Sequence, residues 1–147
     1  MILYHFTGME NVDAIQRDGL EKWVGPDADM VGGAVVWLCD TPTLEATEAE
    51  MEWFRQHHPA ETFVSKRWFG AHKNEPMARF TIRLPSNDQL LKQYGSWVQG
   101  WRRLPDQDSV VARRMLDTWW VYFGNIPPSK IVEFIVEEAI PYWPAPA

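Results

Sequence analysis

Apolar and β-branched stretches bounded by turn residues predict five β-strands along this chain. The stretch at 34–39 is continuously apolar, as buried central strands are. The stretch at 78–84 alternates instead, with Phe80 and Ile82 on one face and polar or charged residues on the other. The predicted strands are residues 2–6, 34–39, 78–84, 119–123 and 131–137.

Between the strands, the spacing of apolar residues predicts helices at 9–18, 43–56, 87–94 and 108–116. Gly19 stands where a helix end requires positive φ, and Thr41 and Pro42 read as the cap and first position of the second helix. Residues 22–33 contain glycines and a proline without periodicity, which predicts a long loop of the kind that often serves as a lid. Residues 57–76 and the proline-rich end at 141–147 give no clear pattern.

The 147 residues, with no repeat or internal linker, predict one domain (1–147) of the α+β class. A net charge of −6 disfavours broad binding to nucleic acid, because phosphates must be neutralised by Lys and Arg. The chain lacks a signal-like segment and a long apolar run and has one cysteine, which predicts a cytoplasmic protein with no membrane association and no internal disulfide. His57, His58 and His72 lack the spacing of a zinc helix, so we predict no metal.

Residues 3–7, LYHFT, place a histidine at the end of the first strand, before a tight turn, a helix and the segment 18–20, DGL. This order resembles the opening of the ADP-ribosyltransferase superfamily, in which an aromatic-His-x-Ser/Thr strand precedes a helix that ends in x-x-Gly-Leu. In that family the histidine hydrogen-bonds a ribose of NAD. The resemblance implies that His5, Phe6 and Thr7 contact NAD, with His5 and Thr7 on the adenosine-side ribose. The alternative for an isolated strand-end histidine is a neutral residue satisfied within the core.

Residues 32–40, GGAVVWLCD, resemble the second motif of that superfamily, a glycine-preceded strand whose aromatic residue stacks on nicotinamide. Trp37 occupies the aromatic position, and its indole face suits a pyridinium ring. The alternative is that Trp37 is a core residue, and the nine tryptophans of the chain leave both a heavily aromatic core and a ligand-stacking surface open. Cys39, in the same run, is expected to be a buried apolar residue.

The third element of the superfamily is a glutamate at the start of a late strand, which stabilises the ribose cation. Aligned by the strand at 119–123, Trp119 stands at that position, and Asp117 is the nearest carboxylate. The resemblance therefore implies His5 and Asp117 as the catalytic residues. Branches that act on RNA 2′-phosphate use histidine with several arginines instead, and four arginines are available for this role. They are Arg79, Arg83, Arg113 and Arg114.

The resemblance implies two small, mainly antiparallel sheets flanked by helices, with NAD bound between them as the substrate. The implied activity is transfer of ADP-ribose to an acceptor macromolecule that the sequence does not identify. Two alternatives stay open: a non-catalytic interaction or inhibitor protein on the same fold, favoured by the missing glutamate, and an enzyme of the RNA 2′-phosphotransferase type.

Overall fold

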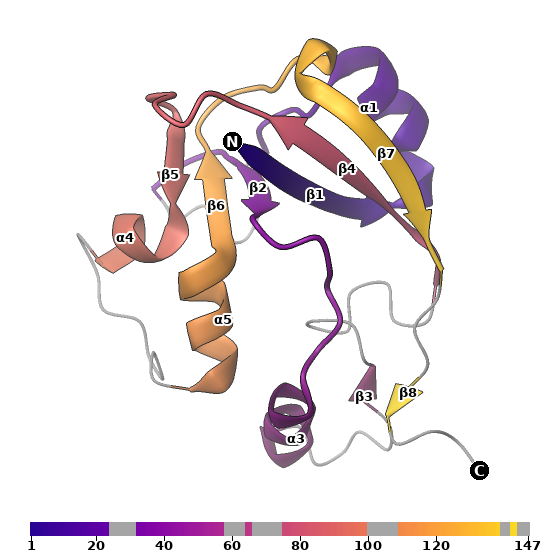
Figure 1. Cartoon of the computed structure of the whole chain (residues 1–147), viewed down its shortest axis with the longest axis vertical. Coiled ribbons are helices and arrows are strands. Elements are labelled where there is room, and N and C mark those ends of the chain that lie inside the picture. Colours follow the sequence, from indigo (N-terminus) through magenta and orange to yellow (C-terminus); the bar gives the residue numbers. More distant parts are fainter. Residues whose placement is uncertain (24–31, 58–63, 66–74, 100–108, 139–141, 144–147) are drawn as a thin grey trace.

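Six strands of the computed structural model pair into one antiparallel sheet, in the order β5-β6-β2-β1-β4-β7 (Figure 1). The structure describes residues 1–23, 32–57, 64–65, 75–99, 109–138 and 142–143. The strands of the sheet are β1 (Ile2–Gly8), β2 (Val36–Cys39), β4 (Met77–Arg83), β5 (Leu91–Gln93), β6 (Trp119–Tyr122) and β7 (Ile131–Glu137). Two further strands, β3 (Val64–Ser65) and β8 (Tyr142–Trp143), pair separately.

The sheet consists of two three-stranded halves that meet at a narrow junction. Strands β1 and β2 are paired at one position, Tyr4 with Cys39, whereas β1 and β4 are paired along all seven residues of β1. In Figure 1, β1, β4 and β7 run side by side, and β2, β6 and β5 lie at an angle to them. The prediction of a mixed, mainly antiparallel fold is confirmed. The prediction of two separate main sheets is wrong, because the Tyr4–Cys39 pairing joins the halves into one.

The five predicted strands are all present, with bounds shifted by one or two residues at most. Ile131–Glu137 forms as predicted, while the apolar run at 34–39 contributes β2 only from Val36. The predicted first helix divides into a 3-10 turn, Met9–Asn11, and α1, Val12–Asp18. Gly19 ends α1 with φ 81°, as predicted.

The helix predicted at 108–116 forms two residues later, as Val110–Thr118, and two other predicted helices differ more from the structure. Helix α3 (Glu48–His57) starts five residues later than expected, because Thr47 and Glu50 form a capping box: each backbone N–H donates to the other side chain, at 2.8 and 3.2 Å. The predicted helix at 87–94 is wrong. Leu91–Gln93 instead forms the edge strand β5 beside β6, and the helix α4 (Tyr94–Gln99) follows it. Edge pairing therefore overrides the local helical pattern.

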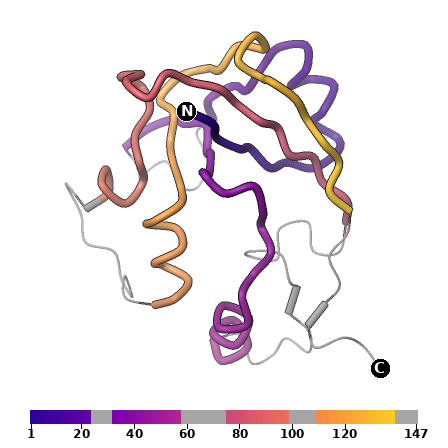
Figure 2. The backbone as a smooth tube through the Cα atoms, viewed as in Figure 1, coloured from indigo at the N-terminus to yellow at the C-terminus, as the bar shows by residue number. Residues whose placement is uncertain are grey.

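The sheet packs on both faces. On one face Leu3 of β1 and Phe80 of β4, both fully buried, pack with Ile15 of α1. On the other, α4 and α5 (Val110–Thr118) cover the half formed by β2 and β6, where Tyr94 and Val121 lie in a second buried cluster. The chain between β2 and α3 leaves the sheet at its junction (Figure 2). The junction is thus bordered by α1 on one side and by an aromatic cluster on the other.

Several predictions fall on segments outside the described residues. These are most of the loop at 22–33, most of residues 57–76 and most of the end at 141–147. Among the helices that the structure describes, none is long and apolar enough to cross a membrane.

Candidate functional site

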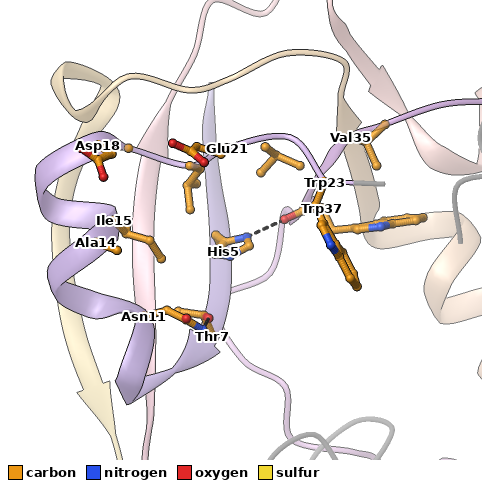
Figure 3. A pocket seen from close by; sticks show the side chains of 13 residues that line it. His5, Thr7, Asn11, Ala14, Ile15, Asp18, Glu21, Trp23, Val35 and Trp37 are labelled. Carbon is orange, nitrogen blue, oxygen red and sulfur yellow. Dashed lines mark hydrogen bonds between the residues drawn. The ribbon is translucent and has the colours of Figure 1, made fainter. Parts of the chain in front are cut away.

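A pocket of about 580 Å³ opens where β1, β2 and α1 meet, and three of the four residues predicted to contact NAD line it. They are His5, Thr7 and Trp37, which lie together in Figure 3 although Trp37 is 32 residues from His5 in the chain. Pockets of this size are typical of small-molecule sites. The remaining lining residues are Asn11, Ala14, Ile15, Asp18, Gly19, Leu20, Glu21, Trp23, Val35 and Val36.

The alternation of strand β1 decides which motif residues face the pocket. His5 and Thr7 are two positions apart and point to the same face, the one covered by α1. Phe6 lies between them and points to the opposite face, where it pairs with Arg79 of β4. Phe6 is not among the lining residues, so the geometry does not support a contact between Phe6 and a ligand in this pocket.

The ring of His5 is fixed by a hydrogen bond across the junction. Its Nδ1 lies 2.8 Å from the backbone carbonyl oxygen of Trp37 (Figure 3). A carbonyl only accepts, so Nδ1 carries the proton. Burial lowers the pKa of His5, and the hydrogen bond to Trp37 only partly opposes this. At neutral pH the ring is therefore neutral, with Nε2 as a hydrogen-bond acceptor.

Thr7 is oriented by the helix that follows it. Nδ2 of Asn11 donates to Oγ1 of Thr7 at 2.8 Å, which leaves the hydroxyl hydrogen of Thr7 to donate elsewhere. The two side chains from β1 thus offer complementary groups. His5 supplies an acceptor and Thr7 a donor, which together suit a pair of neighbouring hydroxyl groups.

Trp37 has a partly buried indole. Its ring packs edge-on against Tyr94 and Trp119, with centroids 5.4 and 5.3 Å apart. The residue lines the pocket and also belongs to the second core, so both interpretations of Trp37 describe part of its environment. Trp119, at the position where the family glutamate was expected, is part of this packing and supplies no carboxylate.

Asp117 lies away from His5. It lines a second pocket, of about 320 Å³, together with Asp40, Arg113 and Trp120. Its carboxylate accepts a hydrogen bond from Arg113 at 2.7 Å on the surface of α5, and the side chain is 58% exposed. The structure therefore does not bring the two predicted catalytic residues together, because Asp117 lies in the last turn of α5 while His5 lies on β1 beside α1.

Among the other lining residues, three have charged or indole side chains and were assigned no role from the sequence: Asp18, Glu21 and Trp23. Asp18 ends α1, and Glu21 follows the Gly19–Leu20 pair that is held by hydrogen bonds between Leu20 and Ile126. Trp23 is 65% exposed and is held beside β2 by backbone hydrogen bonds to Val35. No local signal places Glu21 and Trp23 in the pocket, because both reach it through the pairings of Leu20 with Ile126 and of Trp23 with Val35.

The arginines considered for binding phosphate lie elsewhere. Arg79 pairs with Glu137 at 2.9 Å, and Arg114 pairs with the buried Glu50 at 2.8 Å. None of the four arginines is among the residues that line the pocket of His5; the other two are Arg83 and Arg113. Among the residues that the structure describes, no cluster of arginines therefore surrounds His5.

Cys39 is buried, as expected. Burial raises the pKa of its thiol to about 11, and a hydrogen bond to the carbonyl of Thr41 at 3.2 Å only partly opposes the rise. The thiol is therefore protonated at neutral pH and is not an activated nucleophile.

Within the described part of the chain, no group of three or more His, Cys, Asp or Glu side chains is arranged to hold a metal ion. His58 and His72 lie outside that part. Comparison with known proteins finds no matching family model and no matching curated sequence. The likeness to ADP-ribosyltransferases therefore depends on the residues of the two motifs and on the pocket they line.

Proposed function

We propose that this chain is an ADP-ribosyltransferase-like enzyme that binds NAD in the pocket of His5 and transfers ADP-ribose to an acceptor. The observation that carries the proposal is the convergence of the two motifs. His5 and Thr7 of the first and Trp37 of the second line one pocket, and the ring of His5 is hydrogen-bonded to the carbonyl of Trp37.

The polar groups of β1 support recognition of a ribose. A neutral His5 accepts a hydrogen bond at Nε2, and Thr7 donates one from its hydroxyl. A ribose carries two neighbouring hydroxyl groups, so one can donate to His5 while the other accepts from Thr7. Trp37, and the more exposed Trp23 beside it, supply aromatic surface for the nicotinamide ring.

The acid that assists the reaction is reassigned in this proposal. Cleavage of the bond to nicotinamide develops positive charge on the ribose, and a fixed carboxylate stabilises that charge in the transition state. Asp117 lines the other pocket, whereas Asp18 and Glu21 line the one that contains His5. We therefore assign the electrostatic role to Asp18 or Glu21 and none to Asp117.

The test is calorimetric titration with NAD combined with a measurement of nicotinamide release. The wild type should bind NAD, and His5→Ala should weaken binding about threefold to tenfold, the usual effect of one lost hydrogen bond. Glu21→Gln or Asp18→Asn should slow release about 10²-fold, as expected for one electrostatic group. Asp117→Asn is the matched control and should leave release unchanged. A wild-type protein that neither binds nor cleaves NAD contradicts the proposal.

The second candidate is a non-catalytic interaction protein on the same fold. Two observations favour it: Trp119 replaces the expected glutamate and packs on Trp37, and the edge strand β7 exposes apolar side chains. The exposed residues are Val132, Ile135 and Val136. NAD binding without turnover would favour a sensing or inhibitory domain. The RNA 2′-phosphotransferase alternative gains no support from the positions of the arginines.

A further inference from the structure

Strand β7 forms one edge of the six-stranded sheet, and no strand in the described part of the chain lies beyond it (Figure 1). The other edge strand, β5, has three residues, whereas β7 has seven. Three apolar side chains of β7 are exposed by 40 to 52%, those of Val132, Ile135 and Val136. Proteins usually protect an edge by keeping it short or by placing Lys or Pro in it, and β7 contains neither residue. The strand is therefore open to pairing with another strand.

The hydrogen bonds of the sheet determine which backbone groups of β7 point outward. Met1 and Leu84 exchange two hydrogen bonds through their main-chain atoms, at 2.9 and 3.0 Å, next to the pairing of β1 with β4. Such doubly bonded pairs alternate along an antiparallel ladder, so Phe80 directs its N–H and C=O to β1. Phe134 is opposite Phe80 and therefore directs its own N–H and C=O away from β4, as does Val136 two positions later. These outward groups can bond to the strand of another chain.

A second copy of β7 complements the first in one antiparallel register. A twofold axis at Phe134 places each residue opposite the residue of the second copy that lies equally far from Phe134 on the other side. Val132 is then opposite Val136, and Lys130 is opposite Glu138, each contact occurring twice by symmetry. Val132 has no counterpart on β4, because the register shifts there. The contacts thus match apolar with apolar and positive with negative side chains, both of which stabilise strand pairing.

The neighbouring register fits less well. With the axis at Ile135, Glu133 would lie opposite Glu137 of the second copy, and Val132 opposite Glu138. Like charges placed directly opposite each other on paired strands destabilise the pairing. Charge therefore selects the axis at Phe134.

We propose that two copies of this chain associate through β7, antiparallel about an axis at Phe134, so that one sheet continues across both copies. The pairing of single strands buries less surface than a standard interface, so we expect a weak dimer with a dissociation constant in the micromolar range. No residue of β7 lines the pocket of His5. The inference goes beyond the proposed function and does not rest on it, and the two are tested separately.

Analytical ultracentrifugation at increasing protein concentration measures the association. The wild type should pass from monomer to dimer without larger species. Val136→Lys should raise the dissociation constant at least about tenfold, because it places a charge against Val132 of the second copy at two symmetric contacts. Leu90→Lys is the matched control. Leu90 is 44% exposed and precedes the other edge strand, β5, so this change should leave the dissociation constant unaltered.

A charge swap tests the register. Lys130→Glu and Glu138→Lys should each weaken the dimer severalfold, because each places like charges opposite each other. The double variant restores opposite charges at both contacts and should dimerise like the wild type. Circular dichroism and thermal unfolding check that every variant keeps its fold.

The possible results distinguish this dimer from other uses of the edge. A wild type that stays monomeric at every concentration overturns the inference and leaves the edge to a strand of a different protein. A dimer that survives Val136→Lys, or that Leu90→Lys weakens equally, forms through another surface and also overturns it. Association that the double charge variant restores supports the register about Phe134, and failure to restore it contradicts that register.

Discussion

His5 links the chemistry of the pocket to the stability of the fold. Its ring is half-buried between β1 and α1, and its proton on Nδ1 is committed to the carbonyl of Trp37. Burial makes the protonated ring unfavourable, which is why its pKa is lowered. The same arrangement that leaves Nε2 free to accept a hydrogen bond should therefore make the protein sensitive to acid.

We predict that the free energy of unfolding falls as the pH falls below about 6.5. In that range the unfolded chain protonates this histidine, whose ordinary pKa is 6.5, while the folded chain resists protonation until its lower pKa is reached. The slope from one such group is at most about 1.4 kcal/mol per pH unit. Denaturant unfolding of the wild type and of His5→Asn between pH 5 and 8 measures this pH dependence. The variant should lack the contribution that His5 makes to the slope. If His5→Asn and the wild type lose stability equally as the pH falls, the lowered pKa of His5 is contradicted.

Among the elements, α3 depends on a buried ion pair that connects it to α5. Arg114 donates to Glu50 at 2.8 Å and to the carbonyls of Glu45 and Thr43 at 3.0 and 3.2 Å. The side chain of Glu50 is only 3% exposed, so its charge has little access to water. This pair holds both the capping box of α3 and the segment that leads into it.

Arg114→Ala should destabilise the protein by about 3 to 5 kcal/mol, because it leaves the Glu50 carboxylate buried without its cation. Arg113→Ala is the matched control. Arg113 is the adjacent residue and pairs with Asp117 on the surface, where such a pair contributes about 0 to 1 kcal/mol. Urea unfolding measures the free energy of unfolding of both variants. If both lose a similar amount, the buried pair of Arg114 and Glu50 does not stabilise the protein as predicted.

The turn after α1 depends on a glycine. Gly19 has φ 81°, and a Cβ atom there would lie 2.1 Å from the carbonyl oxygen of Ile126. Gly19→Ala should lower the free energy of unfolding by well over 1 kcal/mol, because alanine disfavours positive φ and because its Cβ would clash with this oxygen. Gly32→Ala separates the two effects, since Gly32 has φ 88° with open space around it and should cost only about 1 kcal/mol. Thermal unfolding measures both, and equal losses would exclude the clash.

The pattern of apolar and turn residues predicted those elements correctly that are determined by their own residues. The strand Ile131–Glu137 could be predicted because its apolar run is bounded by turn residues. The start of α3 could not, since Thr41–Pro42 and Thr47 are both plausible caps and the contact of Glu50 with Arg114, 64 residues away, helps to select Thr47. The edge strand at Leu91–Gln93 likewise depends on its pairing with β6.

The same distinction applies to the pocket. His5 and Trp37 could be proposed from short motifs, because each lies in a strand next to a turn. Glu21 and Trp23 could not, because they reach the pocket only through the pairings of Leu20 with Ile126 and of Trp23 with Val35. Asp117 was also misplaced, because the order of elements along the sequence does not tell which side chains lie close to His5 in space.

At the scale of the whole molecule, the net charge of −6 predicts weak association with nucleic acid. At about 0.15 M salt, a fluorescently labelled DNA duplex or RNA should show no change in anisotropy at micromolar protein. Binding at that salt concentration would show that local basic segments outweigh the overall charge.

The single Tyr4–Cys39 pairing between the half-sheets has a consequence for hydrogen exchange. The pocket takes side chains from both halves, His5 and Thr7 from β1 and Trp37 from β2, so a ligand that contacts all three opposes any opening in which the halves separate. Amides at the junction that exchange through this opening should slow by about a hundredfold when the ligand concentration is about a hundred times its dissociation constant. Amides of α3, which does not line the pocket, should keep their rates, and this contrast would identify the junction as the part of the fold that a ligand stabilises.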